Sequence, residues 1–332
     1  MNTKMLIEFI TVAAAVFGVT VLAERILIPI LKSHKVGQRI LEIGPRWHMS
    51  KSGTPTMGGI CFILSMLIVL AGVAVYTAFT GDTAELIPLA LTLCLGVFNG
   101  IIGFVDDYCK LVKKKNEGLK AYQKFILQLI AAGAYIYIMS STGHINTMLH
   151  IPFTDVSLQL GYGYYALAIL IITGIVNSVN LTDGIDGLAS GVVFVISCFF
   201  AAVAFRLGFE ALSLASAALV GGTLGFLVYN FHPARVFMGD TGSLFLGGMI
   251  VGMAFMIDEP LIILIAAFVC VAETLSVILQ VGYFKLSHGK RLFKMAPVHH
   301  HFEKCGWSEV KIMTVFSLAT LVFCVIAWLG LF

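Results

Sequence analysis

The sequence predicts an all-α integral membrane protein with about ten transmembrane helices. Three observations predict this fold: 59% of the 332 residues are hydrophobic, only 12% are charged, and the apolar residues lie in long runs. The mean hydropathy of +0.96 is far above that of a soluble globular domain. Helices are the expected spanning element because lipid cannot satisfy exposed backbone N–H and C=O groups. A β-barrel is disfavoured, since its strands would alternate polar and apolar residues and these runs do not.

Ten apolar runs are long enough, or nearly so, to cross a bilayer core, which needs about 20 residues per helix. They cover residues 5–31, 57–80, 86–105, 125–141, 163–179, 187–205, 211–229, 243–257, 260–284 and 310–331. The run at 243–257 is short and contains Gly247, Gly248 and Gly252, so it is the weakest of the ten. The first run exceeds the apolar region of a signal peptide and lacks a clear cleavage site, so we expect a membrane helix there.

The lysines and arginines predict the orientation. Ten spans place both chain ends on one side and divide the loops into two sets. One set holds residues 32–56, 106–124, 180–186, 230–242 and 285–309, and of the 21 basic residues only Lys4 and Arg206 lie away from these loops and the adjoining helix ends. The positive-inside rule then makes these loops cytoplasmic and both termini external. Any polar motif in these loops is therefore expected at the cytoplasmic face.

No internal repeat, low-complexity segment or separate soluble region divides the chain, so residues 1–332 are expected to form a single polytopic membrane domain. The longest outer loop, residues 142–162, is rich in Gly, Pro, Asn and Asp and predicts turns with a small hairpin. The seven cysteines include no CxxC pattern and lie mostly within the apolar runs. We interpret them as packing residues rather than disulfide partners or zinc ligands.

Adjacent carboxylates, Asp106 and Asp107 in GFVDDYCK, end the third run at the predicted cytoplasmic boundary. A charge at a membrane boundary is costly and marks a candidate functional site. Neighbours on a helix point about 100° apart, so the two need not share one role. Two anions this close repel one another unless a cation or a proton lies between them. The alternative interpretation is a solvated helix end that pairs with Lys110.

A second polar segment, NSVNLTDGID, separates two membrane runs. Asn177, Asn180 and Asp183 step by three residues, which would place their oxygens on one face of a continuing helix. Asp186 follows after Gly184, and a glycine here allows a turn and the approach of a ligand to the backbone. A helix terminus with Asx-turn chemistry explains one or two such residues, but not four.

A further carboxylate, Asp240 in VFMGDTGS, lies on a glycine-rich turn before the 243–257 run. A hard cation such as Mg²⁺ takes oxygen ligands and usually keeps waters and substrate phosphates in its shell. Together with Asp106, Asp107, Asp183 and Asp186, five aspartates fall on one predicted face of the membrane. The simplest single explanation for this grouping is that they bind a metal ion that carries a phosphate. Asp240 is also a candidate N-cap for the next helix, and both roles can hold together.

Two basic segments complete the predicted cytoplasmic site. Three consecutive histidines, His299, His300 and His301, lack zinc-like spacing and favour contact with phosphate or a leaving group, or proton handling near neutral pH. The segment KSGTPTMGG places Lys51 and Thr56 on a small-residue turn before the second run. That turn suits a phosphate or base contact, although any Gly/Pro turn that enters a helix looks the same.

Together, the motifs TPTMGG, GFVDDYCK, NSVNLTDGIDGLA, VFMGDTGS and APVHHHFE, in this order over ten spans, resemble those of the phospho-N-acetylmuramoyl-pentapeptide transferase family. This family is the bacterial branch of the polyprenyl-phosphate N-acetylhexosamine-1-phosphate transferase superfamily. The resemblance covers essentially the whole chain. The histidine segment is the sharpest discriminator, because relatives that transfer N-acetylglucosamine-1-phosphate share the aspartate motifs but carry a different His-containing sequence in the last cytoplasmic loop.

The resemblance implies a reaction that depends on Mg²⁺ and takes place at the inner face of a bacterial plasma membrane. UDP-MurNAc-pentapeptide and undecaprenyl phosphate would give undecaprenyl-pyrophosphoryl-MurNAc-pentapeptide (lipid I) and UMP. This reaction is the first membrane step of peptidoglycan synthesis, and thus of cell-wall growth, cell shape and division. The implied partners are the two substrates and the lipid bilayer, with no nucleic acid. A homodimer is left open.

Matched motif by motif, the resemblance implies roles for individual residues. Asp240 would be the magnesium ligand, Asp106 the base on the lipid phosphate, and Asp107 a second catalytic or metal-adjacent carboxylate. His299 would join them as a catalytic residue on the pyrophosphate side. The implied substrate contacts are Lys51, Gly184, Ile185, Asp186 and Phe237 around uridine, Lys114 and Lys124 near the phosphates, Asn180 and Asp183 near nucleotide and metal, His300 and His301 near the pyrophosphate and sugar-peptide, and Thr56, Asn177 and Asn230.

Two other functions stay open. A transferase of N-acetylglucosamine-1-phosphate would act on UDP-GlcNAc but not on UDP-MurNAc-pentapeptide. A secondary transporter would place its ionisable groups near the membrane midplane, whereas these aspartates cluster at predicted cytoplasmic ends. The lipid chain needs an apolar groove that the sequence does not place. The 260–284 run, which contains Glu273 and Gln280, is one candidate for its wall.

Overall fold

The computed structural model describes residues 3–33, 51, 53–81, 83–113 and 118–332. Ten helices in these ranges are long and apolar enough to cross a membrane. They are α1 (Thr3–Ser33), α2 (Gly59–Thr80), α3 (Ile87–Lys113), α4 (Ala121–Ser141), α5 (Tyr162–Thr182), α6 (Leu188–Leu207), α7 (Glu210–Asn230), α8 (Gly239–Met256), α10 (Phe268–Leu286) and α12 (Glu309–Leu331). The prediction of an all-α, multi-pass membrane protein with ten spans is confirmed.

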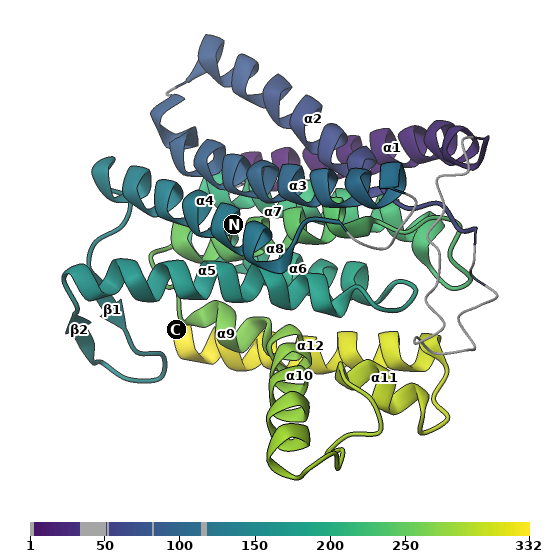
Figure 1. Ribbon diagram of the computed structural model, residues 1–332. Coiled ribbons are helices and arrows are strands. Elements are labelled where there is room, and N and C mark those ends of the chain that lie inside the picture. Colours follow the sequence, from purple (N-terminus) through teal and green to yellow (C-terminus); the bar gives the residue numbers. More distant parts are fainter. Residues whose placement is uncertain (1–2, 34–50, 52, 82, 114–117) are drawn as a thin grey trace.

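Helix α8 is the central helix of the bundle, with α3 and α5 packed closely against it (Figure 1). A Cβ on Gly247 would lie 2.7 Å from Cα of Val176 in α5, and one on Gly248 would lie 3.0 Å from Cα of Gly96 in α3. Because these glycines lack a side chain, the backbone of α8 can lie in direct contact with the backbones of α3 and α5. This packing explains why the 243–257 run is short and glycine-rich: α8 meets neighbouring helices instead of lipid.

The 260–284 run differs from its prediction as one span. It divides into the short α9 (Ile262–Ala266) and the spanning helix α10 (Phe268–Leu286), which meet at Ala267. Figure 1 shows α10 running across the direction of the other long helices and projecting from the bundle. No glycine or proline marks the break. Its cause is packing, because α9 is held against α12 while most of α10 is exposed to the surroundings.

The predicted hairpin in the 142–162 loop is confirmed. Strands β1 (Met148–His150) and β2 (Ser157–Gln159) pair antiparallel, with Leu149 opposite Leu158. Figure 1 shows the hairpin and both chain ends toward the same side of the bundle. The short helices η2 (Thr83–Leu86) and α11 (Val298–Glu303) lie in connecting segments.

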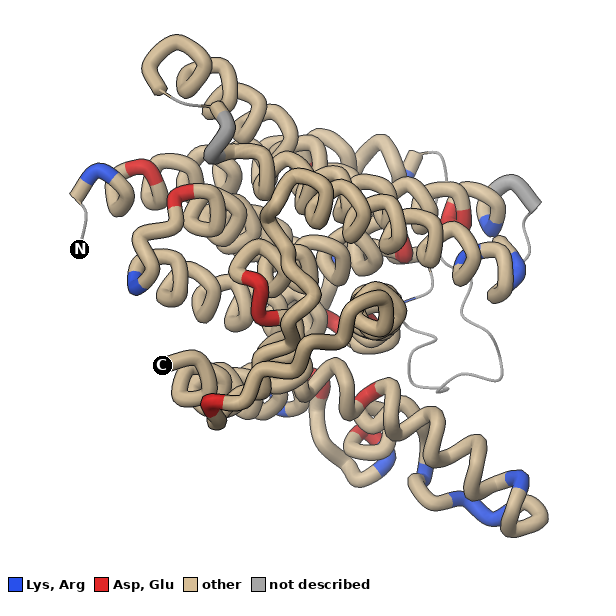
Figure 2. Tube along the Cα trace, turned by 90° about the vertical axis from the view of Figure 1, so that its left-hand side faces the viewer, with Lys and Arg blue, Asp and Glu red and all other residues tan. Residues whose placement is uncertain are grey.

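Basic residues gather at the end of the molecule away from the chain termini, including the far end of α10 (Figure 2). This agrees with the division of the loops into a basic and a non-basic set. Helices α3, α5 and α8 bring their predicted site residues to this basic end. The chain therefore collects its costly carboxylates where lysines can neutralise them.

Candidate active site

The two carboxylates of α3 have different partners. Asp106 lies 2.6 Å from Nζ of Lys110 and accepts a hydrogen bond from the backbone N–H of Leu119 at 2.7 Å. Asp107 accepts two hydrogen bonds from Thr241, from the N–H at 3.0 Å and from the hydroxyl at 2.8 Å. Both side chains are buried. Neighbours that point about 100° apart on a helix thus contact different partners.

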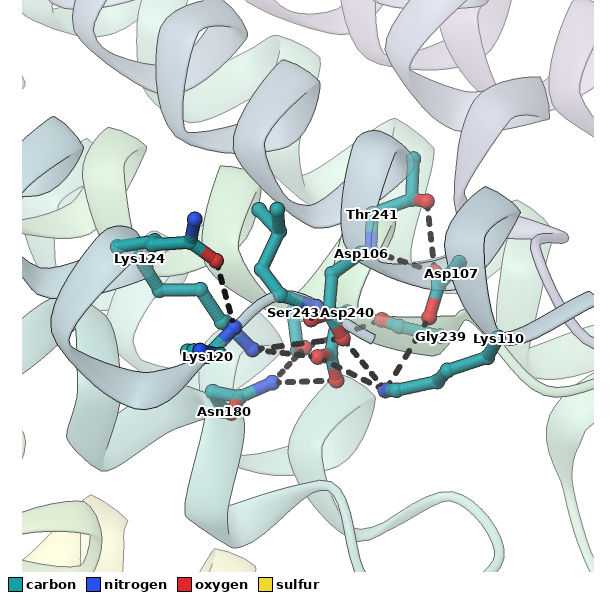
Figure 3. A network of polar contacts seen from close by, with 12 residues as sticks. Asp106, Asp107, Lys110, Lys120, Lys124, Asn180, Gly239, Asp240, Thr241 and Ser243 are labelled. Carbon is teal, nitrogen blue, oxygen red and sulfur yellow. Dashed lines mark hydrogen bonds and ion pairs between the residues drawn. The ribbon is translucent and has the colours of Figure 1, made fainter. Parts of the chain in front are cut away.

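Asp240 lies in the first turn of α8 and faces Asp106 across the site (Figure 3). Its Oδ2 accepts from Nζ of Lys124 at 2.6 Å and from Nζ of Lys110 at 3.2 Å. Its Oδ1 accepts from the side-chain amide of Asn180 at 3.0 Å. Asp240 is not the N-cap, which is Met238, so the carboxylate is free to face the other side chains.

Asp106, Asp107 and Asp240 each offer an oxygen, and these oxygens lie within 4.8 Å of one another. Close backbone approaches create this proximity. Gly103 of α3 has no room for a Cβ against the backbone of Asp240, and the same is true of Gly239 against the carboxylate of Asp107. Gly239 also adopts a φ of +70°, which a side chain would strain.

The turn between α5 and α6 brings Asp183 close enough to the aspartate cluster to be affected by its negative charges. Asp183 ends α5, and burial, reinforced by the negative charges of Asp240, Asp107 and Asp186, raises its pKa to about 8. A bound cation would offset those charges and favour the ionised carboxylate. The turn therefore couples the predicted nucleotide side to the three-aspartate cluster.

Asp186 anchors a second polar cluster, which lies between four segments of the chain. Its Oδ1 accepts from Nζ of Lys51 at 2.6 Å, and its Oδ2 lies 2.9 Å from Nδ1 of His232. Glu309, at the start of α12, accepts from Lys51 and from the backbone N–H of Asp186. The amide N–H of Ala234 completes the cluster by donating to Asp186 at 3.0 Å.

The histidine segment forms the short helix α11. His299 is buried, its Nδ1 lies 3.2 Å from Oε1 of the buried Glu273, and its Nε2 lies against Gly184 with no hydrogen-bond partner among the described residues. His300 pairs with Glu303 at 2.6 Å, and Nδ1 of His301 accepts from the N–H of Lys294. Of the three histidines, His299 is therefore the one directed at the α5–α6 turn.

The segment before α2 runs beside the segment before α8. The N–H of Phe237 donates to the carbonyl of Pro55, and the N–H of Gly58 donates to the carbonyl of Phe237. This pairing places Thr56 beside Gly239 and so beside Asp107. Ile185 is buried in the α5–α6 turn. Lys114 lies outside the described residues.

Asn177 points away from the aspartates and faces α4, where it donates to Gln128 at 2.8 Å. Both residues line a groove of about 620 Å³ between α4 and α5, with Thr274 of α10 at its edge. Lys124 lines the same groove and contacts Asp240. The groove therefore runs from an apolar surface to the carboxylate cluster. The 260–284 run, the candidate wall, contributes Thr274 to the groove, whereas its Glu273 and Gln280 face His299 and the 292–293 backbone.

Asn230 is buried, and its side chain is engaged within the protein. Its amide donates to the carbonyl of Val236, while its oxygen accepts from the N–H of Gly187 and the hydroxyl of Ser190. These contacts tie the end of α7 to the start of α6. The geometry gives Asn230 a supporting position behind the predicted nucleotide side.

Several site residues were not singled out from the sequence: Thr241, Ser243, His232, Glu273 as a histidine partner, and Glu309. Lys110 was named only as the pairing partner in the alternative interpretation of Asp106 and Asp107, and the structure contains that pairing. Glu309 gave no signal in the sequence, since it joins Lys51 and Asp186 only through the packing of α12.

Known proteins are similar to this chain over nearly its whole length. The chain is 46% identical to the phospho-N-acetylmuramoyl-pentapeptide-transferase of Staphylococcus carnosus over 96% of this chain and 98% of the relative. The chain belongs to the phospho-N-acetylmuramoyl-pentapeptide transferase family. Relatives with the same name from Clostridium perfringens strain SM101 (45% identity, 92% of this chain and 91% of the relative) and Clostridium botulinum strain Alaska E43 (46%, 95% and 94%) agree.

Two family models match the segments that carry the site. The model for glycosyl transferase family 4 matches residues 89–258, which include Asp106, Asp107, Asp183 and Asp240. Signature 1 of the phospho-N-acetylmuramoyl-pentapeptide transferase family matches residues 51–63, which begin with Lys51. The histidine segment of this family member lies outside both matches.

Proposed function

We propose that this chain transfers phospho-MurNAc-pentapeptide from UDP-MurNAc-pentapeptide to undecaprenyl phosphate, giving lipid I and UMP. The relatives bear the name of this transferase. The observation that carries the proposal is the position of Lys124, which lines an apolar groove and contacts Asp240 of the three-aspartate cluster. A lipid phosphate and a polar nucleotide sugar can meet only where such a groove reaches a polar site.

A magnesium ion fits the residues present. Three carboxylates with oxygens within 4.8 Å of one another match the preference of Mg²⁺ for oxygen ligands. We propose Asp240 as the ligand, with Asp107 and Asp106 beside it, and Asp107 is already oriented by Thr241. When bound, the ion would neutralise the negative charge of the pyrophosphate.

The chain's own residues supply positioning and charge for the transfer. Lys124 would hold the lipid phosphate at the end of the groove, and Asp106 would accept any proton this phosphate carries. A phosphate oxygen of the lipid then forms a bond to the phosphorus that bears the sugar. The bond between this same phosphorus and the bridging oxygen breaks, and UMP leaves with that oxygen. We propose this direct attack, and trapping a phosphorylated aspartate with the UDP substrate alone would contradict it.

The nucleotide would lie on the other side of the α5–α6 turn. Lys51 contacts Asp186 there, the backbone of Phe237 pairs with the segment that follows Lys51, and His299 faces the same turn. Lys51 is neutralised by two carboxylates, so this side suits a neutral base better than a phosphate. We place UMP there and the pyrophosphate between it and the aspartates, with His300 and His301 toward the sugar-peptide.

The membrane location follows from the same proposal. Ten apolar helices make the chain a multi-pass membrane protein, and the basic end carries the site. By the positive-inside rule we place that end in the cytoplasm of a bacterial cell and both termini outside. UDP-linked substrates are then available to the site from the cytoplasm.

Release of UMP tests the function. Purified protein is given undecaprenyl phosphate with each UDP-sugar in turn, with and without Mg²⁺. We expect UMP and a lipid product only from UDP-MurNAc-pentapeptide with Mg²⁺, and Asp240→Asn should nearly abolish turnover. Product from UDP-GlcNAc alone would favour the other transferase class. Solute transport by vesicles without UMP release would favour a transporter.

A further inference from the structure

Lys110 occupies the centre of the three-aspartate cluster. Its Nζ lies 2.6 Å from Asp106, 3.2 Å from Asp240 and 3.8 Å from Asp107. Figure 3 shows the Lys110 side chain extended, with its terminal ammonium group directed at these carboxylates. Lys124, by comparison, reaches only Asp240 and Asp106. A single lysine thus contacts all three proposed neighbours of the metal.

A lysine and a metal ion cannot share this position. Mg²⁺ binds carboxylate oxygens at about 2.1 Å, so an ion held by these aspartates would lie within contact distance of the ammonium group. Both are cations and would repel strongly in a site that is mostly buried. The four-carbon stem of lysine is flexible, and about a third of the Lys110 side chain is exposed, so the group has a route outward.

We propose that Lys110 holds the metal position between the three aspartates until a divalent cation displaces its ammonium group. The inference rests on the magnesium site of the proposed function, and it adds that Lys110 competes with the metal ion for the three aspartates. Lys110 keeps the carboxylates from repelling one another before the metal arrives. Once displaced, the ammonium group of Lys110 is available to pair with a substrate phosphate.

Metal affinity distinguishes displacement from a general charge effect. Lys110→Met removes the competitor, so binding of Mn²⁺ as a magnesium probe, followed by electron paramagnetic resonance without substrates, should tighten by roughly 10-fold. Lys124→Met, which removes a charge that touches two of the carboxylates, should tighten binding less. Lys120→Met is the matched control, because Lys120 is an exposed lysine on the adjoining segment and should leave affinity unchanged.

A second measurement uses the wild-type chain and so does not depend on a variant that folds. Lysines are acetylated briefly, and peptides are quantified by mass spectrometry with Mg²⁺ or with EDTA. Displacement should speed acetylation of Lys110 by at least about 3-fold when Mg²⁺ is present, since the freed ammonium is exposed. Acetylation of Lys120 should not change.

The outcomes separate this inference from the proposed function, because neither measurement needs a substrate. Metal binding with equal affinities for the Lys110 and Lys124 variants, or a Lys110 acetylation rate that Mg²⁺ leaves unchanged, would overturn the displacement and leave the transferase intact. Failure of wild type and all variants to bind the metal would overturn both the cofactor and the inference. Tighter binding with faster Lys110 acetylation would support it even if another sugar were the substrate.

Discussion

The imidazole of His299 lies directly against Gly184, and a Cβ added to this glycine would overlap Nε2 and Cε1 of the ring. The contact joins α11 to the α5–α6 turn. It places a histidine next to Asp183 and Asp186, which flank the glycine by one and two positions. The relationship ties the histidine segment to the proposed nucleotide side.

Gly184→Ala should disable the enzyme through this contact. The added methyl group must displace the His299 ring or the turn, and overpacking of this kind costs about 1–3 kcal/mol of stability. We expect a lower melting temperature and a large loss of UMP release. Gly163→Ala is the control, since a Cβ there meets open space. Full activity of Gly184→Ala would show that the contact is not required.

Glu273→Gln should lower turnover while the fold persists. Glu273 lies beside Nδ1 of His299, and its Oε2 accepts from the backbone N–H of His299 at 3.4 Å. The substitution would remove the carboxylate that lies 3.2 Å from Nδ1 and so change the electrostatic environment of the ring, and we expect kcat to fall by at least about 10-fold. Glutamine has nearly the same shape, and its side-chain oxygen can still accept from the backbone N–H of His299, so the melting temperature should not fall. Glu210→Gln, at the opposite end of the molecule, serves as the control, and parallel losses in kcat and melting temperature would contradict this role.

Gly174→Leu should impair use of the lipid substrate alone. Gly174 lines the groove, and a Cβ at this position meets no atom within 4 Å, so leucine would occupy the groove without distorting α5. We expect KM for undecaprenyl phosphate to rise by roughly 10-fold, as a bulky group excludes part of the chain. KM for the nucleotide sugar should not change. Gly163→Leu on the same helix controls for the substitution itself, and an equal effect there would remove the groove from the lipid site.

Asp258→Asn should reduce the pH dependence of stability. Burial raises the pKa of Asp258 to about 6, although it accepts hydrogen bonds from Asn146 and Tyr164. The folded state therefore binds a proton more tightly than the unfolded chain, so stability increases as pH falls through about 6 and is lowest above about 7. The variant should lose this gain between pH 7.5 and 5 in thermal unfolding. The exposed Asp155→Asn should keep it, and identical curves for wild type and Asp258→Asn would contradict the assignment.

The proximity of several candidate residues could be predicted because their motifs are local. Asp106, Asp107, Asn180 and Asp240 each stand in a short segment at the end of an apolar run, and the basic loops placed those ends on one side. In the structure these residues meet, with Asn180 donating to Asp240 and Lys124 contacting it. Helix ends that lie on the same side of a compact bundle are close together, so side chains at those ends are expected to meet.

Asn177 shows where local reasoning stopped. Its spacing from Asn180 predicted a shared face, but its side chain pairs with Gln128 of α4 and lines the groove. The spacing of residues along a helix predicts which side chains share a face. It does not predict which neighbouring helix packs against each part of that face. The positions of Glu273 and Gln280 were missed for the same reason.

The sequence by itself determined the spans, the family and the residues that carry charge at the basic end. Hydropathy and local motifs depend on neighbours along the chain, so they can be read without coordinates. Only the tertiary structure decided which partner each charge meets: Lys110 among three aspartates, Glu309 beside Lys51, and His299 against Gly184. Most of these contacts join residues far apart in the chain, so they depend on how the helices pack, as in the close approach of α3 to α8 at Gly103.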